Sequence, residues 1–169
     1  MSTSCRVIVV LGVSGAGKTT VGRELARLWD CEFIEGDDFH SDANRKKMHA
    51  GIPLTDEDRQ PWLESLARAI SQVIARKGRA VVSCSALKRA YRDQLRRDEV
   101  QFVYLRVSHE AVRARLAQRG GHFFNPALLD SQFAALEEPR RAVVVDADQD
   151  VSRVASEIAR QFPNGLSRS

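Results

Sequence analysis

Residues 12–19 have the types and spacing that bind a chain of phosphates. Glycines at positions 12, 15 and 17 can adopt backbone angles closed to other residues, so successive N–H groups can turn inward around an anion. Lys18 adds a positive charge for the β- and γ-phosphates, and the Thr19 hydroxyl is placed to bind Mg²⁺. The alternative, a plain glycine turn, explains neither this lysine nor this hydroxyl. We therefore expect a nucleoside triphosphate to contact Gly12, Val13, Ser14, Gly15, Ala16, Gly17, Lys18, Thr19 and Thr20.

Asp37 is the candidate for the acid that receives a proton during phosphoryl transfer. It follows the second apolar run, and in a parallel sheet such a strand end can lie near the glycine loop. An ionised carboxylate there could accept or orient the proton of an attacking hydroxyl. The alternative is that Asp37 or Asp38 caps the next helix. His40, three residues further on, is the one histidine that we place in the site.

The strand ends also argue against a motor or a switch. Such proteins usually hold Mg²⁺ with an aspartate that closes a buried strand after the glycine loop. The third apolar run ends Ser83-Cys84-Ser85, without an acid. Asp146 closes the last run, where capping a turn is as good an explanation. The pattern favours a kinase for a small molecule.

Two groups of basic residues could bind anions. Lys88 and Arg92, at i, i+4 spacing just after Ser85, could clamp an anionic substrate, or they could form a solvated face. Arg115 and Arg119 lead into Gly120-Gly121 and an aromatic pair, which suggests a lid that closes over the nucleotide and neutralises charge on the transferred group. Surface charge is the alternative for this second group too.

The elements that must position these residues alternate along the chain. Apolar runs that read as buried strands cover 7–11, 31–35, 80–84, 102–107 and 142–145, and stretches of helical period separate them. This order predicts a single α/β domain, with a five-stranded parallel sheet between two layers of helices. We expect helices over 87–97 and 126–136, a lid within about 115–136, and a disordered tail over 163–169.

Composition limits the remaining classes. The 169 residues carry a net charge of +4, from 26 basic and 22 acidic side chains. The basic residues are interleaved with acids, which speaks against nucleic acid as a partner. No apolar stretch approaches a membrane helix or a signal peptide. Three widely spaced cysteines fit reduced thiols in the cytoplasm.

Several longer stretches agree with one known family. They are Val13-Ser14-Gly15-Ala16-Gly17-Lys18-Thr19, Gly36-Asp37-Asp38-Phe39-His40, Lys47-Met48, and residues 51–63, 84–92, 121–124, 128–133 and 136–139. Together they resemble the bacterial-type gluconate kinases of the shikimate-kinase-like group, from Val7 to about Ile158. The glycine loop is common to many enzymes, whereas residues 51–63 and 84–92 are far more specific.

The resemblance implies a fold and a reaction. The fold is that of the P-loop kinases related to nucleoside-monophosphate kinases, with a helical lid, often in a homodimer. The reaction is phosphorylation of D-gluconate to 6-phosphogluconate with ATP and Mg²⁺. Lys18 and Thr19 match the phosphate and metal contacts, and Asp37 matches the position that holds the attacking hydroxyl. Arg115 and Arg119 match the lid, and the sugar-acid motifs contain His40, Arg59, Ser85, Lys88, Arg92 and Gln132.

Two other readings stay open from sequence. A kinase for another hydroxy acid, such as shikimate or a different aldonate, would share the fold. A nucleotide-dependent regulatory or nucleic-acid-binding module would also contain the glycine loop, and strongly salt-dependent nucleic-acid binding would favour it.

Overall fold

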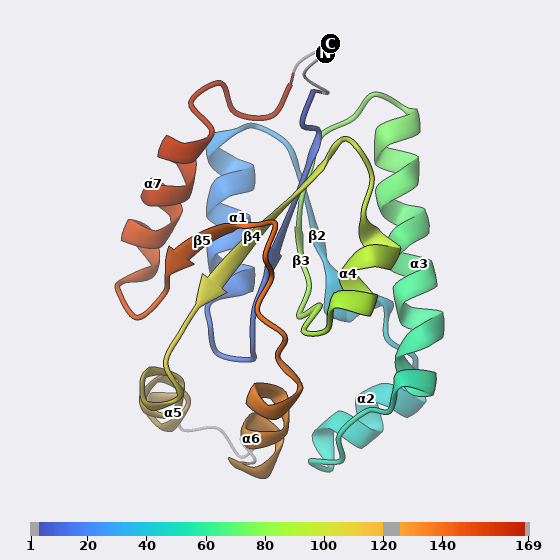
Figure 1. Ribbon diagram of the computed structural model, residues 1–169, viewed down its shortest axis with the longest axis vertical. Helices are drawn as coiled ribbons and strands as arrows, with labels where there is room; N and C mark the ends of the chain where they lie inside the picture. The colour runs from blue at the N-terminus through green and yellow to red at the C-terminus, as the bar shows by residue number, and fades with distance from the viewer. Residues whose placement is uncertain (1–3, 120–125, 168–169) are drawn as a thin grey trace.

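The computed structural model describes residues 4–119 and 126–167 and contains one parallel sheet (Figure 1). Its strands are β1 (Val7–Leu11), β2 (Glu32–Glu35), β3 (Ala80–Ser83), β4 (Val100–Arg106) and β5 (Val143–Asp146). They lie in the order β2-β3-β1-β4-β5. This confirms the predicted α/β class and the five-stranded parallel sheet.

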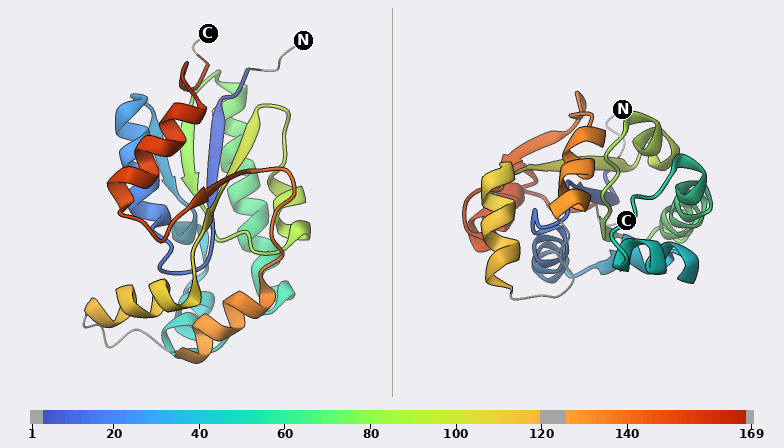
Figure 2. Two further views of the ribbon diagram at one scale, coloured as in Figure 1. Left: turned by 60° about the vertical axis from the view of Figure 1, so that its left-hand side comes forward. Right: turned by 90° about the horizontal axis from the view of Figure 1, so that it is seen from below.

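The helices form two layers and a group at one end of the sheet. They are α1 (Lys18–Leu28), α2 (Asp42–His49), α3 (Asp56–Ala75), α4 (Arg89–Leu95), α5 (His109–Gln118), α6 (Pro126–Ala135) and α7 (Val151–Gln161). Helices α1 and α7 cover one face, and α3 and α4 cover the other. Helices α2, α5 and α6 lie beyond the carboxyl ends of the strands (Figures 1 and 2).

Strand β1 is buried from both sides, and its side chains alternate between two cores. Ile8 and Val10 pack into the core beneath α1 and α7. Val7, Val9 and Leu11 pack into the core beneath α3 and α4. All five are fully buried, which explains why this strand reads as a continuous apolar run. The glycine loop is thereby anchored to the centre of the molecule.

Helix α4 is shorter than predicted. We expected a helix over 87–97, but α4 begins at Arg89, because Ala86 has a φ of 40° and Lys88 is extended. Lys88 is therefore the residue before the helix rather than a member of its first turn. The i, i+4 face that would align Lys88 with Arg92 does not form.

The prediction of a disordered tail is wrong for residues 163–167. Leu166 is 1% exposed and belongs to the core beneath α1 and α7. The backbone N–H of Ser167 donates to the carbonyl of Cys5. Gly165, with a φ of 62°, turns the chain against Trp29. One leucine without helical or strand periodicity gave no signal of this packing.

Among the described residues, no helix is both long and apolar enough to cross a membrane.

Candidate active site

The glycine loop leaves β1 and enters α1 with the backbone that a phosphate nest requires. Gly15 and Gly17 have φ angles of 80° and 96°, in the region that favours glycine. A Cβ at Gly15 would also lie 2.9 Å from a methyl carbon of Val112. Helix α1 starts at Lys18, so the free N–H groups of its first turn point toward the loop.

Lys18 and Thr19 already meet polar partners near the loop. The Lys18 ammonium donates to the Val13 carbonyl at 2.9 Å. Burial lowers the pKa of Lys18, and the nearby Asp37 carboxylate opposes this shift. The Thr19 hydroxyl donates to the Glu35 carboxylate at 2.6 Å. Thr20, in contrast, is exposed on α1.

Glu35 is a candidate that the sequence analysis missed. It ends β2, and Ser83 at the end of the adjacent β3 donates to its second carboxylate oxygen. The Glu35 carboxylate therefore links the ends of β2 and β3 to the Thr19 hydroxyl. A lone glutamate at the end of a short strand has no diagnostic spacing. Only the knowledge that β2 and β3 are neighbours could have indicated it.

Asp37 lies in the 3₁₀ turn Gly36–Phe39 that directly follows β2. The turn is packed tightly, because a Cβ on Gly36 would lie 2.2 Å from the Ser83 carbonyl, and Trp62 donates to the Gly36 carbonyl at 2.7 Å. The Asp37 residue is exposed to solvent, but the surrounding protein still raises the pKa of its carboxyl group by desolvation. The charge of Lys18 opposes this shift, and the charge of Glu35 adds to it. The acid and the ammonium of the loop therefore interact directly through their charges.

His40 directly follows this turn, and its side chain is buried. It is 8% exposed and stacks on Trp62 with ring centroids 4.2 Å apart. Burial, and then the charges of Arg59 and Arg45, lower its pKa to about 4. His40 is consequently neutral at neutral pH. A neutral imidazole can exchange hydrogen bonds with a hydroxyl but does not attract a carboxylate by charge.

Two cationic side chains, those of Arg59 and Lys88, meet at Tyr91 near the start of α3. Arg59 donates to the Tyr91 hydroxyl at 3.2 Å, and Lys88 donates to the Asp56 carboxylate at 3.0 Å. The Tyr91 hydroxyl also donates to Asp56. Arg59 and Lys88 both lie over the Tyr91 ring, 5.5 and 5.6 Å from its centroid. The structure thus brings together Arg59 and Lys88, which are far apart in sequence.

Arg92 lies elsewhere. Its side chain is buried, and its guanidinium donates to the carbonyls of Ala86, Leu87 and Glu137, each at 2.8–2.9 Å. These bonds hold the segment between β3 and α4, which contains the half-buried Ser85. Arg92 therefore stabilises the segment between β3 and α4 and does not form an anion-binding pair with Lys88.

Arg115 and Gln132 reach the glycine loop from α5 and α6. The Arg115 guanidinium donates to the carbonyls of Gly15 at 3.3 Å and Gln149 at 3.1 Å. The Gln132 side-chain oxygen accepts from the Ser14 N–H at 2.7 Å, on the nucleotide side rather than among the sugar-acid candidates. Arg119 is exposed beyond the end of α5. The predicted hinge, residues 120–124, lies outside the described residues.

Known proteins resemble this chain along most of its length. Residues 14–163 match the family described as shikimate kinase. A probable gluconokinase of Dictyostelium discoideum is 40% identical over 171 residues, which cover 95% of this chain and 86% of that protein. The thermosensitive gluconokinase of Escherichia coli K12 is 43% identical over 155 residues, covering 88% of this chain and 83% of its own.

Solved structures agree. A gluconokinase from Sinorhizobium meliloti 1021 superposes with a TM-score of 0.83 at 43% identity, over 94% of each chain. A shikimate kinase from Bacteroides thetaiotaomicron superposes with a TM-score of 0.65 at 19% identity, over 94% of this chain and 98% of its own. The second likeness supports the fold alone.

Proposed function

Because the chain belongs to the shikimate kinase family, we propose that it is a gluconokinase, which transfers the γ-phosphoryl group of ATP to D-gluconate and forms 6-phosphogluconate. The observation that supports this most directly is the position of Asp37. Its carboxylate interacts electrostatically with Lys18 of the glycine loop, and its turn leads directly to His40, which lies within the influence of the Arg59 charge. A phosphate donor and a hydroxylated acid can meet at that carboxylate.

The donor side is assigned to the glycine loop. Its N–H groups and Lys18 would hold the phosphates, while Lys18 exchanges the Val13 carbonyl for a phosphate oxygen. Thr19 and Glu35 fit a magnesium site, because a hydroxyl and a carboxylate already share one hydrogen bond at the strand ends. When bound, Mg²⁺ neutralises charge on the β- and γ-phosphates.

The acceptor side is assigned to four residues. Arg59 or Lys88 would attract the carboxylate of gluconate, and His40 and Ser85 would bond its hydroxyls. The primary hydroxyl would then lie against Asp37, whose carboxylate would accept the hydroxyl proton as the hydroxyl oxygen attacks the γ-phosphorus. The bond from the γ-phosphorus to the oxygen that bridges the β-phosphate would break at the same time and release ADP. Positioning of this kind accounts for most catalysis in phosphoryl transfer.

The lid and the assembly follow from the same proposal. Arg115 would hold the glycine loop in place around the phosphates. Arg119 would approach the transferred phosphoryl group when residues 115–136 move over the nucleotide.

We further propose that the protein is a cytoplasmic homodimer and that its activity requires Mg²⁺. Light scattering of the purified protein tests the dimer.

A substrate panel tests the reaction itself. Purified protein with MgATP should turn over D-gluconate with a kcat/KM at least about a hundredfold above that for shikimate or other aldonates. A different acceptor would leave buried polar groups of the site without hydrogen-bond partners, which disfavours its reaction. If the protein turned over shikimate as fast as D-gluconate or faster, shikimate would be assigned as the acceptor instead of D-gluconate.

A further inference from the structure

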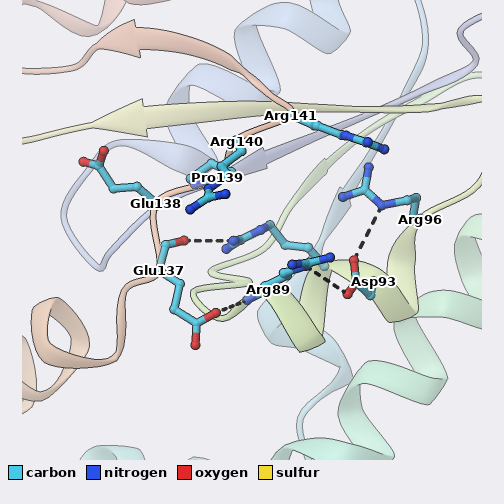
Figure 3. A pocket seen from close by; sticks show the side chains of 9 residues that line it. Arg89, Asp93, Arg96, Glu137, Glu138, Pro139, Arg140 and Arg141 are labelled. Carbon is cyan, nitrogen blue, oxygen red and sulfur yellow. Dashed lines mark hydrogen bonds and ion pairs between the residues drawn. The ribbon is translucent and has the colours of Figure 1, made fainter.

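A charged cavity lies between α4 and the segment that follows α6. It has a volume of about 560 Å³, which is large enough for a sugar phosphate or a nucleotide. Arg89, Arg92 and Asp93 of α4 and Arg96 just after it line one side, and residues 137–141 line the other (Figure 3). None of the lining residues belongs to the glycine loop, and only Arg92 was among the predicted acceptor residues; its guanidinium is bound to backbone carbonyls.

The charge of this cavity is positive after its internal pairs are counted. Asp93 is shared by Arg89 and Arg96, at 3.7 Å from each. The Glu138 carboxylate is held by Arg106, which does not line the cavity. The Glu137 carboxylate accepts from the backbone N–H of Arg89. The five arginines that line the cavity outnumber its three acids, so its net charge is positive.

Arg140 and Arg141 are two of these five arginines. Both are exposed, both line the cavity, and neither forms an ion pair within residues 4–119 and 126–167. Their side chains point in different directions, that of Arg141 toward the side of Arg96 (Figure 3). A bound anion would neutralise positive charge that no carboxylate of the described residues pairs with.

The opposite wall is held in place before any ligand arrives. Arg96 lies over the Phe102 ring, 5.1 Å from its centroid, and also contacts Asp93. Arg92 is fixed at the base by backbone carbonyls on both sides of the cavity, those of Leu87 and Glu137. Arg92 and Arg96 are thus ordered before binding, so the entropic cost of binding falls mainly on Arg140 and Arg141.

We propose that this cavity is a second ligand site, which binds the phosphate group of a small phosphorylated metabolite through Arg96, Arg140 and Arg141. Guanidinium groups match phosphate because their planar donors can bond two oxygens at once. The site is separate from the proposed reaction and does not depend on the identity of the acceptor. Sugar phosphates and nucleoside monophosphates share the recognised group.

Calorimetric titration of the full chain tests the site. The glycine loop is first saturated with Mg²⁺ and a non-hydrolysable ATP analogue, and inorganic phosphate, glucose 6-phosphate and AMP are then added separately. We expect saturable binding of at least one probe, weakened tenfold or more in the Arg140→Ala/Arg141→Ala double variant. The preferred probe identifies the scaffold that carries the phosphate.

A control with the same change in net charge separates the cavity from general electrostatics. Arg153→Ala/Arg160→Ala removes two exposed arginines from α7 and should leave the affinity within twofold of wild type. Absence of saturable binding, or equal weakening in both double variants, would overturn the proposal. So would a change of oligomeric state in the Arg140→Ala/Arg141→Ala protein without loss of probe binding, which would assign the arginines to a contact between copies.

Discussion

The Thr19 hydroxyl and the Glu35 carboxylate share a hydrogen bond of 2.6 Å. It joins the first turn of α1 to the end of β2, and Ser83 at the end of β3 completes the group. Three elements therefore fix the orientation of the hydroxyl that we assign to Mg²⁺. This resembles the way outer groups orient metal ligands in other proteins.

Replacing Glu35 with glutamine should weaken the use of Mg²⁺. The amide keeps the size of the side chain but removes its charge, so we expect the half-saturating Mg²⁺ concentration to rise by about ten- to a hundredfold. Steady-state rates at fixed ATP and varied Mg²⁺ measure this. Glu32→Gln is the matched control, because Glu32 is exposed on the same strand and pairs with Arg76. An unchanged Mg²⁺ dependence in Glu35→Gln would remove this residue from the metal site.

Replacing Arg92 with methionine should cost stability before it costs substrate binding. The change leaves the carbonyls of Ala86, Leu87 and Glu137 without their buried donor. We expect the free energy of unfolding in urea to fall by about 2–3 kcal/mol. Arg89→Met, at an exposed position of the same helix, should have little effect. A raised KM for gluconate with unchanged stability would instead place Arg92 on the substrate.

His40 should make stability depend on pH. Its pKa is about 4 in the folded protein against the ordinary 6.5, so the unfolded chain binds more protons between these values. The contribution of His40 is fully present above about pH 6.5 and is lost as the pH falls toward 4. Urea unfolding at pH 5 and pH 7 should show a smaller difference for His40→Phe than for wild type. Equal differences would contradict the low pKa.

The tail should contribute to the core. Leu166→Ala removes a side chain that is 1% exposed, and we expect a loss of about 2–4 kcal/mol in the free energy of unfolding. Asn164→Ala, two residues earlier and exposed, is the control and should change stability little. Thermal unfolding of both variants measures the contrast. If the two melt together, the tail is not part of the folded core.

The sequence was sufficient to predict the fold and to locate the glycine loop and the turn that contains Asp37. Alternating apolar runs and helical stretches predicted the parallel sheet because each buried strand of such a sheet, like β1, must be apolar on both faces. The glycine loop was readable because its function depends on local spacing. The acidic turn at Asp37 was readable because it follows a strand.

The rest depends on contacts between distant segments. Glu35 joins the site only because β2 and β3 are adjacent, and Gln132 meets Ser14 across 118 positions of the chain. Arg92 was predicted either to clamp an anionic substrate or to lie on a solvated face, but the left-handed turn at Ala86 exposes carbonyls that need a buried donor. The charge of Arg92 and its spacing from Lys88 did not distinguish a structural role from a substrate-binding role.

Asp37→Asn provides the most direct test of the proposed transfer. With MgATP and D-gluconate, its kcat should fall by about two to four orders of magnitude, because the amide cannot accept the hydroxyl proton. Asp38→Asn, at the exposed neighbouring position in the same turn, should keep kcat within about threefold. A wild-type kcat in Asp37→Asn, or an equal loss in both variants, would contradict transfer at Asp37.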